Sequence, residues 1–520
     1  MKNRFLTTLL LIPLLAGCPG TPASDEPQSM PDDYVPANLP DYYEDKNTGA
    51  IKSDEDYVYF DIYGISDFHG AVNYNKDNKE LGLARLSSYY DKKREDNPGG
   101  TLLLSSGDMW QGSADSNLTR GTMVTYSMNL MDFDSMALGN HEFDWTIDWI
   151  KNNKERANFP LVCANLINKD THEIADFVTP STIIERGQGE EKYKIGVVGT
   201  IGDNIKNTII ASAVAEYEFA DEIQTVKSET QKLREQGCDI VVWTSHNDAK
   251  TLKERVGRDN PGVDLVIGGH SHVTYVDQLG EVAFMQSKAY GHSLTHATLR
   301  LNKDTRSVSL EAINADDNPT ENEIEEDAQV AALVNEYQEK FINPVKNRVV
   351  GSVDADLTIK ETLSNLCVYS MAEELKRNEQ FSSYEVRAAF HNVNGGVRKD
   401  ILAGEISYGN VYESFPFDNE IVILKLNGYY LYYDFYSKKN NTAIWHSFET
   451  ADDIKDDEEY YIITTDFLLT NNDYYAPTQK NIKEVIYTNI MVRDAVANQI
   501  KLSSPLVSED YSMYRSCFKR

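Results

Sequence analysis

Short apolar runs recur along the first part of the chain, and most of them end in glycine or polar residues. The run Val58 to Ile65 alternates at Val58, Phe60 and Ile62, the pattern of a strand with one buried face. Other short runs predict further strands, at residues 101–104, 135–138, 194–199, 239–243, 263–267 and 295–301. Helical patterns such as residues 224–236 lie between them. This alternation predicts an α/β domain with its site along the edge where the strands end.

A second region begins after a helical pattern. Apolar positions recur at helical spacing from Val330 to Phe341, and Asn343-Pro344 predicts the end of that helix. The stretch before it is acidic, so we interpret residues 306–345 as a linker and connecting helix. Residues 346–520 mix helices with strands such as 421–424 and 460–464. They predict a smaller α+β domain.

Polar side chains follow five of the predicted strands directly. The potential metal ligands among them are Asp67, His69, Asp108, Asn140, His246, His270 and His272. Carboxylate, imidazole and amide oxygen form a mixed set suited to Zn, Mn, Co or Fe. Seven ligands are too many for one ion and suit two metal ions that share a carboxylate. One histidine at a strand end is usually structural, but five such loops together favour a metal centre.

The densest polar segment is Gly139-Asn140-His141-Glu142-Phe143-Asp144-Trp145, which follows a short strand. Taken alone, it could be a strand end before a helix, with Asp144 as a cap. The similar segments at other strand ends favour a role in chemistry.

The composition restricts the class of partner. A chain of 520 residues suggests two or three domains. Its net charge of -32 argues against binding to DNA or RNA, which requires Lys and Arg to neutralise phosphates. A small phosphate substrate remains compatible, provided that metal ions or local cations supply positive charge.

The N-terminus has the pattern of an exported protein. Lys2 and Arg4 precede an apolar run, and the ending Leu15-Ala16-Gly17-Cys18 resembles the lipidation box of bacterial lipoproteins. We expect residues 1–17 to be a signal peptide and Cys18 to anchor the protein to a membrane of the bacterial cell envelope, outside the cytoplasm. An ordinary signal peptide is the alternative. Residues 18–55 are rich in Pro, Asp, Glu and Ser and predict a flexible tether.

Four further cysteines stand far apart and form no CxxC pair, at Cys163, Cys238, Cys367 and Cys517. Their pairing stays open.

The strand-end motifs resemble those of the calcineurin-like metallophosphatases, and their order and spacing are most similar to the secreted 5'-nucleotidase family, which includes bacterial UDP-sugar hydrolases. The resemblance implies an αββα sandwich with two divalent metal ions (Zn, Mn or Co) over residues 56–305. It implies one metal held by Asp67, His69, Asp108 and His272. The other would be held by Asp108, Asn140, His246 and His270, with Asp108 as the bridge.

The same resemblance gives the catalytic groups. His141 would stabilise the phosphoryl transition state, with protonation of the leaving oxygen as a further option, and Asp144 would orient it. The nucleophile would be a metal-activated water. Glu142 receives no catalytic role and is interpreted as scaffold.

In the second domain, Asn394-Gly395-Gly396-Val397-Arg398, residues 414–419 and residues 466–473 resemble the substrate-binding segments of that family. The resemblance implies a set of substrate contacts at Lys360, Asn394, Arg398, Phe417, Asn419, Phe467 and Asp473. The two phenylalanines would sandwich the base, the arginine would hold phosphate and the aspartate would bind ribose. Two departures affect substrate details: Val393 stands where the family has Asn, and bulky residues surround Asp473.

These features predict a nucleotide phosphohydrolase that removes the 5'-phosphate from nucleoside monophosphates, with longer nucleotides or UDP-sugars as further substrates. Closure must bring its two domains together, with the helix from Val330 to Phe341 as the pivot region. One alternative is a 3'-nucleotidase with 2',3'-cyclic phosphodiesterase activity, although Asp144 favours the 5' branch. The others are a non-catalytic nucleotide-binding lipoprotein and an adhesin or immune modulator with this fold.

Overall fold

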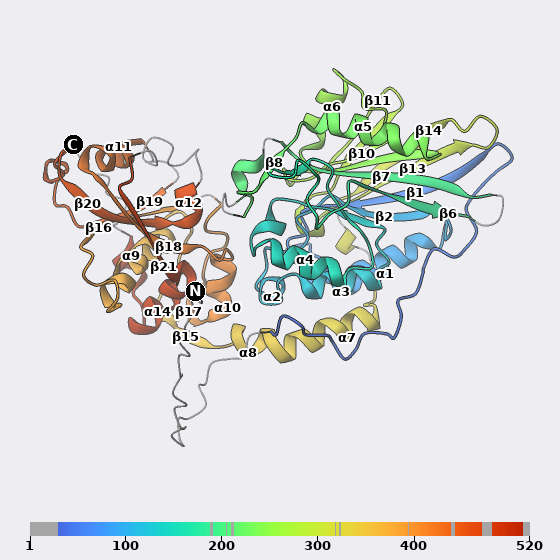
Figure 1. Cartoon of the computed structure of the whole chain (residues 1–520). Coiled ribbons are helices and arrows are strands. Elements are labelled where there is room, and N and C mark those ends of the chain that lie inside the picture. Colours follow the sequence, from blue (N-terminus) through green and yellow to red (C-terminus); the bar gives the residue numbers. More distant parts are fainter. Residues whose placement is uncertain are drawn as a thin grey trace, which may run out of the picture.

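The computed structural model describes residues 30–187, 191–203, 205–209, 213–317, 319–321, 324–393, 395–437, 442–470 and 481–512. The chain forms a larger N-terminal body and a smaller C-terminal one, joined by α7 (Ala328–Tyr337) and α8 (Asn343–Lys346) (Figure 1). Within the described part of the chain, no helix combines the length and the apolar character that a membrane span requires.

Two six-stranded sheets form the centre of the N-terminal domain. The first has the order β14 (Val308–Asp316), β13 (Leu294–Asn302), β1 (Tyr57–Ile65), β2 (Thr101–Ser105), β3 (Ser135–Ala137) and β4 (Leu161–Val162). The second has the order β11 (Tyr275–Leu279), β12 (Val282–Gln286), β10 (Leu265–Ile267), β9 (Ile240–His246), β7 (Tyr193–Ile201) and β6 (Ser181–Arg186). A small antiparallel pair, β5 (Leu166–Asn168) and β8 (Tyr217–Phe219), lies beside them.

The alternating pattern of β1 explains how the sheets stack. Its residues Val58, Phe60 and Ile62 are buried in the core between the two sheets, whereas Tyr63 and Ile65 belong to the core under the helices. Successive side chains of a strand point to opposite faces, so one strand contributes to both cores. The result is the predicted αββα sandwich.

Helices cover the outer face of each sheet (Figure 1). The first sheet carries α1 (Gly82–Arg94), α3 (Thr122–Leu130), α4 (Ile147–Arg156) and α7, and the short α2 (Ala114–Asn117) precedes α3. The second sheet carries α5 (Glu222–Glu235) and α6 (Ala249–Val256). The helix predicted at residues 224–236 is confirmed as α5, which Asp221 caps by accepting a hydrogen bond from the backbone of Gln224.

The C-terminal domain is built on one mixed five-stranded sheet. Its order is β19 (Thr442–His446), β16 (Val386–Asn392), β20 (Glu459–Thr465), β18 (Glu420–Asn427) and β21 (Glu484–Met491). One face packs on α9 (Thr362–Arg377) and α14 (Val492–Leu502), and the other on α11 (Gly428–Ser437) and α12 (Asp466–Thr470). A two-stranded ribbon of β15 (Val349–Val353) and β17 (Gly404–Ser407) leads into α10 (Tyr408–Ser414).

The connecting helix has a feature that the periodicity did not predict. After α7 the chain winds into a π-helical turn over Gln338–Ile342 before α8 begins. Such turns interrupt the regular hydrogen-bond ladder and often occur at functional positions. The interruption lies at the junction between the two domains.

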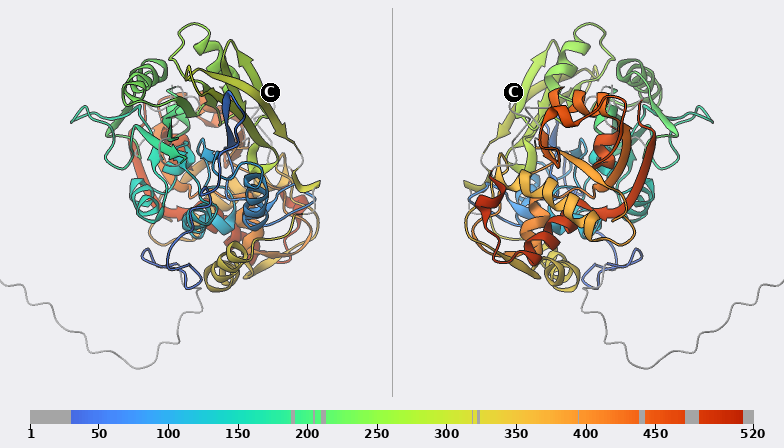
Figure 2. Two further views of the ribbon diagram at one scale, coloured as in Figure 1. Left: turned by 90° about the vertical axis from the view of Figure 1, so that its right-hand side faces the viewer. Right: turned by 90° about the vertical axis from the view of Figure 1, so that its left-hand side faces the viewer.

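Two segments differ from the sequence predictions. Residues 306–316 were expected in a linker, but β14 pairs antiparallel with β13 and extends the first sheet to Asp316. Residues 30–55, expected as part of a flexible tether, form an N-terminal strap whose first part lies against α7 and whose last part runs up to β1 (Figures 1 and 2). The carboxylate of Glu336 on α7 accepts hydrogen bonds from the Tyr34 hydroxyl (2.5 Å) and from the backbone amides of Ala37 and Asn38.

Candidate dimetal site

Five loops that follow the carboxyl ends of strands meet where the two sheets face each other. In the first sheet β1, β2 and β3 run parallel side by side, and in the second β10 and β9 do the same. Parallel neighbours end at the same sheet edge, so the residues that follow them gather there. Those residues are the predicted ligands Asp67, His69, Asp108, Asn140, His246, His270 and His272.

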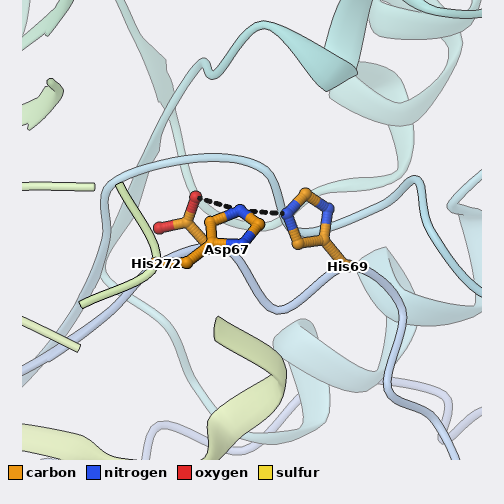
Figure 3. Close-up of side chains that lie close together, drawn as sticks. All are labelled: Asp67, His69 and His272. Carbon is orange, nitrogen blue, oxygen red and sulfur yellow. Dashed lines mark hydrogen bonds and ion pairs between the residues drawn. The ribbon is translucent and has the colours of Figure 1, made fainter. Parts of the chain in front are cut away.

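The first group of donors is Asp67, His69 and His272, whose ligand atoms all lie within 4.8 Å of one another. The Nε2 atoms of His69 and His272 are 3.0 Å apart, and His272 Nε2 is 3.4 Å from Asp67 Oδ1. Figure 3 shows these side chains pointing toward one another. An imidazole–imidazole approach this close leaves ring nitrogens facing a common point, as ligands of one ion do.

The second group is Asp108, His246 and His270. His246 Nε2 is 3.0 Å from Asp108 Oδ2, and Asn140 Oδ1 is 3.1 Å from both His246 Nε2 and His270 Nδ1. His246 Nε2 also lies 4.0 Å from Asp67 Oδ1, so the two groups adjoin. The structure therefore brings all seven predicted ligands together.

Backbone carbonyls orient two of the histidines. His69 Nδ1 lies 2.8 Å from the carbonyl oxygen of Gln111, and His246 Nδ1 lies 2.8 Å from that of Ser106. A ring N–H that donates to a carbonyl fixes the tautomer and leaves the opposite nitrogen free to bind a metal. In both residues that nitrogen is Nε2, which faces the donor group.

Five of the ligands have left-handed backbone conformations. Their φ angles are +53° at Asp67, +49° at His69, +54° at Asp108, +72° at His270 and +58° at His272. Each such residue other than glycine costs about 1–3 kcal/mol and persists where its surroundings enforce it. The loops enforce it by mutual hydrogen bonds. The amide of Asp67 donates to the Gly107 carbonyl, and that of His69 donates to the Asp108 carbonyl.

Close packing explains the glycine at the head of the central motif. A Cβ on Gly139 would lie 2.1 Å from Asp108 Oδ1, so any side chain there would displace this ligand.

The charges of the cluster fit divalent cations. Burial raises the pKa of Asp67 to about 6, and burial lowers the pKa of His270 and of His272 to about 4. The imidazoles of His270 and His272 are then neutral near neutral pH, with free lone pairs. Buried carboxylates are costly unless cations accompany them. A carboxylate, imidazole and amide set of this kind suits Zn, Mn or Co.

His141 and Asp144 form the predicted pair. His141 Nδ1 lies 2.8 Å from Asp144 Oδ2, and the backbone amide of His141 donates to Asp108 Oδ1 at 2.8 Å. Burial lowers the pKa of His141, but the charges of Asp144 and Asp108 outweigh it and raise this pKa to about 9. The carboxylate thus fixes the ring and holds its proton on Nδ1.

Glu142 has a structural role that sequence reasoning understated. Its fully buried carboxylate accepts hydrogen bonds from the backbone amides of Gly139 (2.7 Å), Asp108 (2.8 Å) and Met109 (2.9 Å). Burial raises its pKa to about 7. The residue ties the loop that carries Asp108 to the loop that carries Asn140. The sequence shows an acidic residue inside a motif of metal ligands, which suggests that it has a role there. No sequence pattern predicts which distant backbone amides it binds.

The C-terminal domain places two predicted substrate residues at the same site. The ring of Phe417 stacks on that of His141, with centroids 5.8 Å apart. The guanidinium of Arg398 lies 5.2 Å from the Phe417 centroid. A cavity of about 440 Å³ opens beside them and is lined by residues of both domains, including His69, Tyr290 and Lys399.

The other substrate predictions have different outcomes. Lys360 is exposed ahead of α9 and forms no ion pair within the described residues. Asn419 is buried, and its carbonyl accepts the amide of Val492. Phe467 is half-buried on α12, against the core on that face of the sheet. Predictions for Cys18, Asn394 and Asp473 lie outside the described residues.

Comparison with known families agrees with this architecture. Residues 60–274 match the model of the calcineurin-like phosphoesterases, and residues 349–448 match that of the 5'-nucleotidase C-terminal domain. The chain therefore belongs to the calcineurin-like phosphoesterases that carry a 5'-nucleotidase C-terminal domain.

Individual relatives are distant. The chain is 27% identical to an apyrase from Tabanus yao over 67% of this chain and 66% of the apyrase. It is 26% identical to protein UshA of Escherichia coli, over 73% of this chain and 76% of UshA. The crystal structure of a 5'-nucleotidase precursor from Thermus thermophilus has the same fold. Its TM-score is 0.68 at 18% identity, and the match covers 86% of this chain and 97% of that one. Among the first curated relatives, the match spans 29% to 66% of the relative's length.

Proposed function

We propose that this protein is a two-metal phosphohydrolase that removes the 5'-phosphate from nucleoside monophosphates. One observation carries the proposal. The pair His141–Asp144 lies beside the donor groups, and Phe417 from the other domain stacks directly on His141. An aromatic ring at that place can hold a base while the phosphate reaches the metal ligands, which is the geometry a nucleotide requires.

The donor groups would hold two divalent cations. Asp67, His69 and His272 would hold the first, Asn140, His246 and His270 the second, and Asp108 would bridge both. When bound, such ions polarise the phosphoryl oxygens and supply the attacking water.

The remaining groups would position and stabilise the reacting phosphate. Asp144 keeps the Nδ1 proton of His141 in place, so the other ring nitrogen is available to the phosphoryl or leaving oxygen. Arg398 brings a guanidinium to the same site, and its fork can hold two phosphate oxygens. In phosphoryl transfer, such positioning and charge stabilisation account for most of the catalysis.

We further propose that the protein acts outside the cytoplasm, as a lipoprotein anchored through Cys18. The sequence Leu15-Ala16-Gly17-Cys18 supports this. Mass spectrometry of the membrane fraction should detect an acylated N-terminal peptide that begins at Cys18, and Cys18→Ala should release the protein from that fraction. A soluble wild-type protein would contradict the anchor.

A substrate panel tests the activity. Phosphate release from AMP, 3'-AMP, 2',3'-cyclic AMP, ADP and UDP-glucose should be measured with added Mn²⁺, Zn²⁺ or Co²⁺. The proposal predicts release from AMP that a chelator abolishes. Release only from the 3' and cyclic substrates would favour a 3'-nucleotidase, and binding of AMP without turnover would favour a nucleotide-capturing protein.

A further inference from the structure

The turn Pro416-Phe417-Asp418 is held from both domains at once. Asn117 of the N-terminal domain donates from Nδ2 to the Pro416 carbonyl at 2.8 Å. Arg493 of the C-terminal domain donates to the Phe417 carbonyl at 3.0 Å. Each residue of the turn has a partner, because the Asp418 carboxylate forms ion pairs as well.

Asp418 joins one arginine from each domain. Its Oδ2 pairs with Arg120 of the N-terminal domain, and its Oδ1 pairs with Arg493 on α14. The side chain of Asp418 is 18% exposed and that of Arg493 is 7% exposed. Burial raises the pKa of Asp418, but Arg493 and Arg120 outweigh it and hold this pKa below its ordinary value. The carboxylate is therefore ionised and has a partner on each side.

Arg120 is fixed in advance on its own domain. Its backbone has a left-handed φ of +50°, and Asn153 Nδ2 donates to its carbonyl at 2.8 Å. Its guanidinium lies 5.6 Å from the Trp145 ring centroid. A side chain that is already held loses less conformational entropy when it forms a pair.

The segment that carries these contacts also reaches the metal ligands. The Gln111 carbonyl orients His69, and the Gly112 amide donates to Asn117 Oδ1 at 2.9 Å. The short stretch of residues 111–120 thus contacts the predicted metal ligand His69 at its start and the C-terminal domain at its end.

We propose that Asp418 is a positioning residue that latches the two domains in the closed arrangement. When the domains separate, Asp418 retains its ion pair with Arg493, which belongs to the same domain, but its ion pair with Arg120 breaks. Only the Asp418–Arg120 pair therefore depends on closure. The latch holds Phe417, its neighbour in the chain, against His141. It also keeps Arg398 at the metal ligands. A nucleotide would use both Phe417 and Arg398, so it depends on the latch more than a small phosphoester that would use Arg398 alone.

The test compares Arg120→Ala and Arg120→Lys with wild type in the full-length protein. Small-angle X-ray scattering should show a larger radius of gyration for Arg120→Ala, and Arg120→Lys should restore the compact form in part. Arg234→Ala is the matched control. The pair Arg234–Asp264 has exposures of 35% and 18%, against 34% and 18% for Arg120–Asp418, but lies within one domain. The control should leave the radius of gyration unchanged.

A kinetic measurement, which rests on the proposed function, gives a second readout. Arg120→Ala should raise the KM for AMP roughly tenfold and should affect hydrolysis of p-nitrophenyl phosphate less, because the small phosphoester loses the help of Arg398 but has no base for Phe417 to hold. An unchanged radius of gyration together with a KM change below about twofold would overturn the latch. If wild type hydrolyses neither substrate, the proposed function fails, and the scattering result alone still decides the latch.

Discussion

Replacing Glu142 with glutamine should loosen the loops that carry the metal ligands. One carboxylate oxygen, Oε2, accepts the amides of Asp108 and Gly139, and the other, Oε1, accepts the amide of Met109. Glutamine has one side-chain oxygen and one NH2 group. The NH2 group takes the place of a carboxylate oxygen opposite a backbone N–H, so two hydrogen-bond donors face each other there. The lost charge-assisted hydrogen bond is worth about 1.5–3 kcal/mol, and the unsatisfied buried donor adds about 1–3 kcal/mol. We expect a total loss of about 2.5–6 kcal/mol.

Calorimetry of the metal-free protein measures this loss as a shift in the unfolding transition of the N-terminal domain. For a domain of this size the shift should be roughly 10 °C. Glu229→Gln is the matched control. Glu229 is also buried, but it is bonded to the side chains of Ser181 and Lys232, so its shift should correspond to less than about 1 kcal/mol. A Glu142→Gln shift as small as that of the control would refute the reasoning.

Three further changes separate catalysis, substrate binding and the strap. His141→Ala should lower kcat for AMP by about 10²–10⁴-fold with little change in KM; a near-normal kcat would contradict its catalytic role. Phe417→Ala should raise KM by roughly tenfold for AMP, GMP and UMP alike, because stacking is indifferent to the base; an effect on one base only would argue against stacking. Glu336→Gln should speed hydrogen exchange of the backbone amides in the N-terminal strap. Burial raises the pKa of Glu336, but Lys340 and Tyr34 outweigh it and hold this pKa at about 2. The unfolded value is about 4.3, so the stabilisation is complete above that pH and is lost as the pH falls toward about 2. Unchanged exchange in Glu336→Gln would show that the carboxylate does not hold the strap.

The strands and the metal ligands were predictable because both leave local patterns. Strand β10 is buried on both faces, with Leu265 and Ile267 between the sheets and Val266 under the helices, so it appears as a continuous apolar run. Ligands follow such runs directly, because parallel strands present their carboxyl ends at one edge. Position in the sequence was then enough to place His270 in the site.

The features that escaped prediction depend on contacts between distant segments or on the backbone. Strand β14 is an edge strand beside β13, and none of its side chains is fully buried, so its sequence lacks the continuous apolar run that marks β10. The strap docks through Tyr34 and Glu336, which are 302 positions apart. The sequence pattern does not predict the left-handed φ angles of the metal ligands either. It also does not predict the ion pair between Asp418 and Arg120.

The most direct test of the central claim combines metal content with phosphate release in wild type and Asp108→Asn. Wild type should bind two divalent metal ions per chain and release phosphate from AMP. Asp108→Asn should lower the metal content and abolish most of the release, because the proposed bridge loses its charge. Undiminished release of phosphate from AMP by Asp108→Asn would contradict the account.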